Sequence, residues 1–168
     1  MRNSRIFILL FGVILCQGCK VNYGFTGADI PAGAKNFSIR YFQNFAATSP
    51  VTYTQEITEA LKDLFLAQTP LDLVKEKGDL QFEGAVTSYA ISTTAVSAEE
   101  QSTSNRLTIT VKIKYINTFD KSKNFEKSFT RFENFPSSEN LASVEKELTG
   151  KINKQFTQDI FDASIGKW

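Results

Sequence analysis

NRLTITVKIKY, residues 105–115, has the clearest alternation of apolar and polar residues in the chain. Its apolar residues, from Leu107 to Tyr115, occupy every odd position, and the even positions between them carry threonine and lysine. A period of two residues is typical of a β-strand that buries one side and exposes the other. The protein is therefore expected to contain a sheet with one covered face and one polar face.

Three segments upstream are expected to extend this sheet. They lie at residues 36–42, 71–74 and 79–91. In the first segment Phe37, Ile39 and Tyr41 share one side, which is the pattern of a half-buried strand. In the third segment the apolar residues change from even to odd positions. This change of parity predicts a bulge or bend near residues 87–88, or the end of one strand there.

Residues 125–135 are harder to assign, because the spacing of their four phenylalanines fits both a helix and a strand. Their aromatic and threonine content, directly after a polar turn at residues 120–124, favours a strand. We therefore expect this segment to pair with the strand that contains residues 105–115.

Two segments have the spacing of amphipathic helices. In residues 53–68 the apolar side chains of Ile57, Leu61, Leu64 and Phe65 form one stripe. A second and longer segment begins near Leu141 and repeats its apolar residues in steps of three and four up to Ile160. Neither stripe can be buried within its own helix. The expected fold is α+β, with two helices packed on one face of a four- to five-stranded, mostly antiparallel or mixed sheet.

The first 18 residues have the layout of a signal peptide. Two arginines precede an apolar run over residues 6–15, and Gly18-Cys19 follows. This run is too short to span a bilayer, which takes roughly 20 apolar residues. We expect a signal peptide at residues 1–18, a lipidated tether at residues 19–34 and one α+β domain at residues 35–168.

Two cysteines compete for the processed position. Cys19 follows a small residue, Gly18, whereas Cys16 follows Leu15, and a small residue is needed before the cut. The run LCQGC at residues 15–19 resembles the lipobox of bacterial lipoproteins, although its leucine lies one place further out. Cys19 is therefore the expected lipidation site. The alternative is an ordinary secretory signal with a chance cysteine.

The residue inventory excludes most catalytic chemistry. The chain has no histidine, and Cys19 would be the only cysteine left after processing, so sites built on histidine or on a free cysteine are ruled out. Two carboxylate pairs remain, Glu99 with Glu100 and Asp79 with Glu83, and both are expected to be solvated. We expect no enzyme, no metal site and no cofactor.

The net charge of the mature chain argues against a nucleic-acid partner. The chain has 19 Lys and Arg residues, two of them in the signal, which leaves 17 against 18 Asp and Glu residues. A net charge near −1 does not favour nucleic-acid binding.

Several segments together resemble the LptE family of lipopolysaccharide-assembly lipoproteins, in a compact form. The resemblance is carried by YGFTGADIPAGAKNFSIRYFQN at residues 23–44, EALKDLFLAQTPLDLV at 59–74, GDLQFEGAVTSYAIS at 78–92, NRLTITVKIKY at 105–115, FEKSFTRFENF at 125–135 and DIFDASIGKW at 159–168. None of these is a catalytic signature. Their order and spacing over nearly the whole mature chain carry the match.

The resemblance implies a cellular location and a function. LptE-like proteins sit at the outer membrane, facing the periplasm, and lodge within a large β-barrel partner, LptD. Together they deliver lipopolysaccharide to the outer leaflet. We therefore expect a plug and assembly factor anchored through Cys19, with an LptD-like barrel and lipopolysaccharide as partners. Lys20 is compatible with outer-membrane delivery, because an aspartate there retains some lipoproteins at the inner membrane.

Lipid A carries phosphates, so its contact surface should offer cations beside hydroxyls. Lys112 and Lys114 project from one side of the clearest strand, next to two threonines. Arg106, Lys127 and Arg131 join this patch if the next strand pairs as a hairpin. The alternative is a solvated strand face whose lysines discourage edge pairing.

The barrel contact is expected at the polar loop SAEEQSTS, residues 97–104, and at the exposed strand face. A second interpretation remains open. The chain is then a stand-alone periplasmic lipoprotein that binds a small apolar ligand or another envelope complex, because one fold serves many functions.

Overall fold

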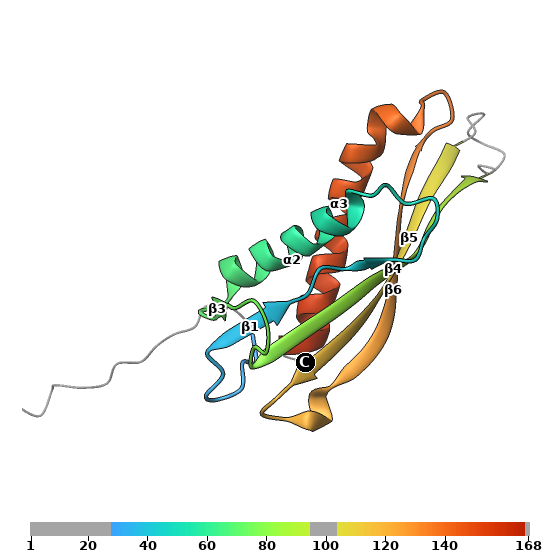
Figure 1. Cartoon of the computed structure of the whole chain (residues 1–168). Helices are drawn as coiled ribbons and strands as arrows, with labels where there is room; N and C mark the ends of the chain where they lie inside the picture. The colour runs from blue at the N-terminus through green and yellow to red at the C-terminus, as the bar shows by residue number, and fades with distance from the viewer. Residues whose placement is uncertain (1–27, 95–103, 167–168) are drawn as a thin grey trace, which may run out of the picture.

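The computed structural model describes residues 28–94 and 104–166 (Figure 1). Cys19, the signal segment and most of the SAEEQSTS loop lie outside these residues. The elements, in chain order, are β1 (Asn36–Ile39), β2 (Gln43–Asn44), α2 (Tyr53–Gln68), β3 (Asp72–Leu73), β4 (Leu80–Thr94), β5 (Ser104–Asn117), the 3-10 turn η1 (Lys121–Lys123), β6 (Phe125–Pro136) and α3 (Leu141–Ile165).

The strands form one mixed sheet in the order β3-β1-β4-β5-β6, and β2 also pairs with β4. The short strands β1, β2 and β3 pair in parallel, whereas β4, β5 and β6 form a long antiparallel meander. Both helices lie on the same face of this sheet (Figure 1). The predicted α+β class and the two-helix layer are confirmed. The sheet has six strands, however, rather than four to five.

The extra strand arises because the predicted strand at residues 36–42 is divided. Tyr41, expected on the buried side, is 61% exposed, and Phe42 is buried instead. The amide of Phe42 donates to the hydroxyl of Thr58 in α2 at 3.1 Å, so it is not available to a neighbouring strand. This contact with the helix ends β1 at Ile39, and pairing resumes in β2.

The change of parity in β4 is a bulge. Its register against β5 shifts between Val86 and Ser88, which leaves Thr87 without a paired residue. Because of this shift, Val86 and Tyr89 both point toward the helices although one is even and the other odd. The bulge predicted near residues 87–88 is confirmed.

The strand predicted at residues 125–135 is confirmed as β6, which pairs with β5 as expected. The strand predicted at residues 71–74 is shorter than expected, since only Asp72 and Leu73 pair with β1. Within the described residues, no helix is both long enough and apolar enough to cross a membrane.

The core lies between the sheet and the two helices, and aromatic rings occupy its centre. Phe65 of α2 is fully buried, and its ring lies 5.3 Å from that of Phe37, 4.8 Å from that of Phe82 and 5.2 Å from that of Phe161. These partners come from β1, β4 and α3. One side chain therefore joins both helices to the sheet.

Candidate functional site

The face of the sheet opposite the helices carries no layer of described structure, and it holds the candidate site (Figure 1). Odd-numbered residues of β5 are buried against the helices, so its even-numbered residues point outward. Cross-strand partners in an antiparallel pair point the same way, which extends this face across β4 and β6. We call it the open face. Its side chains are Glu83, Ala85, Ser88, Ala90 and Ser92 of β4, Arg106, Thr108, Thr110, Lys112 and Lys114 of β5, and Glu126, Ser128, Thr130, Phe132 and Asn134 of β6.

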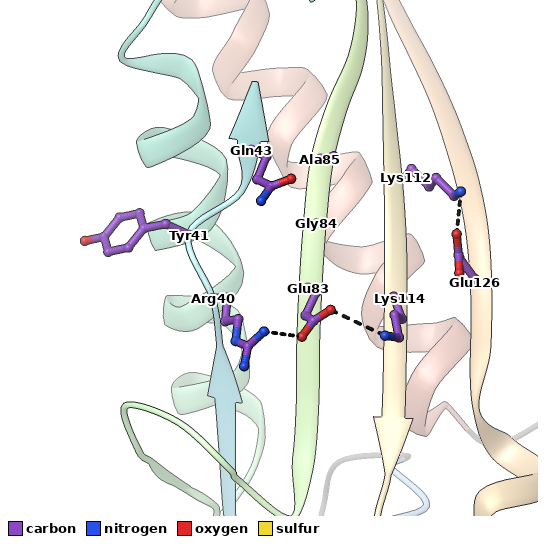
Figure 2. A pocket seen from close by; sticks show the side chains of 9 residues that line it. All are labelled: Arg40, Tyr41, Gln43, Glu83, Gly84, Ala85, Lys112, Lys114 and Glu126. Atoms are coloured by element: carbon purple, nitrogen blue, oxygen red, sulfur yellow. Dashed lines mark hydrogen bonds and ion pairs between the residues drawn. The ribbon is translucent and has the colours of Figure 1, made fainter. Parts of the chain in front are cut away.

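One end of the open face is charged and hollowed. A depression of about 270 Å³ is lined by Arg40, Tyr41, Gln43, Glu83, Gly84, Ala85, Lys112, Lys114 and Glu126. Figure 2 shows the carboxylate of Glu83 between two cations, with Arg40 at 2.6 Å and Lys114 at 3.6 Å. Lys112 forms an ion pair with Glu126 of the neighbouring strand. Three cations and two carboxylates leave this end with one net positive charge.

These ion pairs lie in contact with solvent and can exchange partners. The side chains of Lys112 and Glu126 are 50% and 53% exposed. The hydrogen bond from Lys112, together with its charge, lowers the pKa of the Glu126 carboxyl, so this group stays ionised at neutral pH. Exposed ion pairs of this kind contribute little to stability, because solvent screens their charges. An anionic ligand can therefore replace the carboxylates at little energetic cost.

The middle of the open face is flat and rich in hydroxyl groups. The hydroxyls of Thr110 and Thr130 lie 3.0 Å apart across β5 and β6, and Ser88 pairs with Thr110 from the other side. Small side chains at these positions leave the sheet surface accessible. The strip offers hydrogen-bond donors and acceptors without bulky obstacles.

The other end of the open face carries Arg106, the third predicted cation on this side. Its Nε donates to the side-chain oxygen of Asn134 at 2.9 Å, and its guanidinium lies 4.0 Å from the ring centroid of Phe132. Two outward-pointing residues of β5, Thr108 and Thr110, lie between Arg106 and Lys112. Arg106 is thus on the same face as the lysines but not in the same cluster.

The remaining two predicted residues, Lys127 and Arg131, lie on the opposite side of the sheet. They face Ile113 and Ile109, whose side chains point toward the helices. Arg131 donates two hydrogen bonds to Asp159 of α3, at 2.6 and 2.5 Å, and these bonds raise the pKa of its guanidinium. The structure therefore brings Lys112 and Lys114 together, with Arg106 further along, and separates Lys127 and Arg131 from them.

Sequence reasoning did not assign Arg40 or Glu83 to this charged end, and it named Glu83 only as half of a carboxylate pair expected to be solvated. Arg40 follows β1, and β1 pairs with β4 in parallel. No local sequence pattern predicts this pairing, so the contact between Arg40 and Glu83 could not be expected. Of the predicted carboxylate pair, Glu83 is bound by two cations, and Asp79 accepts the backbone amides of Lys35 and Asn36 at 2.8 and 3.2 Å. Both carboxylates thus have structural partners. In the described part of the chain, no three acidic side chains gather as metal ligands would.

Two solved structures align with this one at low sequence identity. A protein of the DUF330 family from Xanthomonas campestris aligns with a TM-score of 0.52 and 11% identity, over 81% of this chain and 90% of that one. A minor lipoprotein from Acinetobacter baumannii aligns with a TM-score of 0.48 and 16% identity, over 80% and 98%. No curated protein matches the sequence.

The protein is thus an α+β domain whose sheet is covered by helices on one face and presents a polar surface on the other. The particular family follows from the sequence. The chain belongs to the LptE family of lipopolysaccharide-assembly proteins, whose family model matches residues 34–164. This membership supports a role in lipopolysaccharide assembly.

Proposed function

We propose that this protein is an outer-membrane lipoprotein that plugs an LptD-like β-barrel, helps it to assemble, and assists the passage of lipopolysaccharide to the outer leaflet. It acts by binding and positioning and is not an enzyme. The observation that carries the proposal is the family match over residues 34–164, which covers the whole sheet and nearly all of both helices.

The membrane anchor in this proposal is a lipid on Cys19, attached after residues 1–18 are removed. The sequence around the cut supports it, since Gly18 supplies the small residue before the cysteine. The anchor also fits the domain boundary, because the sheet begins at Asn36 and leaves a short connection from Cys19. The domain then faces the periplasm.

The open face supports a contact with the wall of a barrel. A barrel lumen is polar and wet, so a plug inside it should present hydrogen-bonding groups rather than an apolar surface. The hydroxyl strip around Thr110 and Thr130 has this character. The helix-covered face holds the core and needs no partner.

The charged end of the open face supports a contact with the phosphates of lipid A. Lysine and arginine bind phosphate through charge-assisted hydrogen bonds, and neighbouring hydroxyls add further donors. Lys112 and Lys114 point the same way, and Arg40 lies across Glu83 from Lys114. We propose that phosphate displaces Glu126 and Glu83 from these cations on binding.

Reversing the charge of Lys112 and Lys114 tests this contact. The variant K112E/K114E is expected to bind lipopolysaccharide at least about tenfold more weakly, a loss of about 1.4 kcal/mol or more. The physical reason is that two phosphate-binding cations become anions. Binding is measured by titration of the purified protein, with circular dichroism as the check on folding.

The matched control changes the net charge of the protein by the same amount, but on the other side of the sheet. The variant K127E/K154E replaces two exposed lysines that lie on the helix side. It is expected to bind lipopolysaccharide as the native protein does. Equal losses in the two variants would show a nonspecific effect of charge, and unchanged binding in K112E/K114E would remove the charged end as the site.

A further inference from the structure

Strand β6 forms one edge of the sheet, and β5 is the only strand with which it pairs among the described residues (Figure 1). It is 12 residues long, whereas β3 at the opposite edge contributes only two. The outer side of β6 therefore presents a row of backbone amides and carbonyls without a strand partner. Such a row is a template for pairing with an extended segment of another chain.

The backbone groups that point out from this edge belong to the even-numbered residues of β6. In β4, the carbonyl of Phe82 accepts the amide of Arg40 at 3.0 Å and so points away from β5. Facing residues of an antiparallel pair either bond to each other or both point away. Tyr115 of β5 faces Phe82, so its backbone groups point toward β6, as do those of the other odd-numbered residues of β5. These residues face odd-numbered residues of β6, which leaves the even-numbered amides and carbonyls from Glu126 to Asn134 directed outward.

A groove of about 660 Å³ lies between this edge and α3. It is lined by most residues of β6 between Phe125 and Arg131 and by Asp159, Asp162 and Ala163 of α3. The buried ring of Phe129 and the methyl group of Ala163 form apolar parts of its wall. A strand added to β6 would direct every second side chain into this groove and the others toward the open face.

One cation in the groove has no carboxylate partner. Arg131 is bonded to Asp159, whereas Lys127 forms no ion pair with any described residue, and its ammonium lies 5.1 Å from the ring centroid of Phe129. A charge on the covered side of an edge strand discourages pairing with most other strands. A segment that places a carboxylate beside Lys127 is the exception, because it supplies the missing partner.

The helix layer disfavours a second copy of the domain as the occupant. Helix α3 reaches the edge strand, since Asp159 accepts from Arg131 and Gln155 donates to Glu133 at 2.7 Å. Two copies joined through β6 would bring two α3 helices together over strands about 4.8 Å apart. Packed helices need about 8–10 Å between their axes, so these two would overlap. An extended segment that carries no helix layer avoids this overlap.

We propose that an extended segment of the barrel partner adds to the free edge of β6 as a further strand. Its apolar side chains and one carboxylate enter the groove beside α3, and its polar side chains extend the open face. This inference rests on the proposed function, which assigns the adjoining open face to the barrel. Backbone hydrogen bonds supply the affinity, and Lys127 selects an acidic segment. Lys127 has this role only when the barrel is present, so titration of the purified protein with lipopolysaccharide does not depend on it.

A proline at position 128 tests the added strand. S128P removes an amide that points out from the edge and leaves the bonds between β6 and β5 in place, which is where edge strands tolerate proline. The comparison is S128A, which loses the same hydroxyl but keeps the amide. Each tagged, full-length variant is extracted from membranes in a gentle detergent, and the recovered barrel is quantified. S128P is expected to recover about tenfold less barrel than S128A. Equal recovery by the two variants would overturn the inference.

A crosslink keeps the test decisive if S128P fails to fold. The photoreactive residue p-benzoylphenylalanine is introduced in place of Ala163, which lines the groove, and in a second variant in place of Leu66, which is exposed on α2. Position 163 is expected to crosslink to a barrel segment of alternating apolar and polar residues that contains an acidic side chain. Position 66 should not crosslink to that segment. A crosslink from position 163 to a second copy of this chain, or none while the barrel co-purifies, would overturn the inference.

The native protein separates the two ways of failing. If it recovers the barrel and S128P recovers as much as S128A, only the added strand is wrong and the proposed function stands. If the native protein is recovered without a barrel, the proposed function fails as well.

Discussion

Replacing Phe65 by alanine is expected to lower the free energy of unfolding by about 3–5 kcal/mol, the usual cost of removing a fully buried phenylalanine. The ring contacts three other buried rings that belong to β1, β4 and α3, so the cavity cannot close by the movement of one element. Small domains have only about 5–15 kcal/mol of stability in total. Urea unfolding followed by circular dichroism measures the loss.

The neighbouring residue supplies the control for this prediction. Leu66 follows Phe65 on α2 and is 48% exposed. Its replacement by alanine should change the unfolding free energy by less than about 1 kcal/mol, since little apolar area is lost. Equal losses for L66A and F65A would contradict a core centred on Phe65.

Alanine at Gly78 is expected to destabilise the protein by about 3 kcal/mol. A Cβ at this position would lie 2.5 Å from the backbone nitrogen of Ser38 and 2.6 Å from the carbonyl carbon of Phe37. These are backbone atoms of β1, so relief requires β1 to move away from the start of β4 and to loosen the parallel pairing of Phe37 with Leu80. Forcing extra volume into a packed site costs about 1–3 kcal/mol and sometimes more.

Alanine at Gly150 should instead raise the free energy of unfolding. Gly150 lies within α3, and no atom stands within 4 Å of its would-be Cβ. Alanine there removes the helix penalty of glycine and should stabilise the protein by about 1 kcal/mol. Thermal or urea unfolding of G78A and G150A in parallel measures both effects. A loss of stability in both variants would contradict the packing described for Gly78.

Much of the fold was predictable because local periodicity dictates it. Strand β5 alternates over its whole length, both helices carry continuous apolar stripes, and the change of parity in β4 marks the bulge at Thr87. The division of the first strand was not predictable. The amide of Phe42 donates to the hydroxyl of Thr58 in α2, and its ring lies over Gly84 of β4, where a Cβ would leave no room. No local sequence pattern predicts contacts between residues so far apart in the chain.

The candidate site was predictable only where its residues share one strand. Lys112 and Lys114 are two positions apart on β5 and must point the same way. The side on which Lys127 and Arg131 lie depends on the register between β5 and β6, and a shift of one residue would have moved both to the open face. That register is set by the turn at residues 118–124, where Asn117 accepts the amides of Phe119 and Asp120.

The proposed anchor and the open face together explain how this LptE-family domain would act. In the proposed function, the lipid on Cys19 holds the domain at the outer membrane, and the hydroxyl strip and the charged end of the open face contact the barrel wall and the phosphates of lipid A. The helices on the other face supply the stability that lets the open face remain uncovered.

Co-purification shows whether the protein binds a β-barrel in the outer membrane. The tagged protein, expressed at its native level, is extracted from membranes in a gentle detergent and its partners are identified by mass spectrometry. We expect a large outer-membrane β-barrel of the LptD kind, together with lipopolysaccharide, to be recovered in near-stoichiometric amount. Recovery of the lipidated protein alone would contradict the plug and favour a stand-alone envelope lipoprotein.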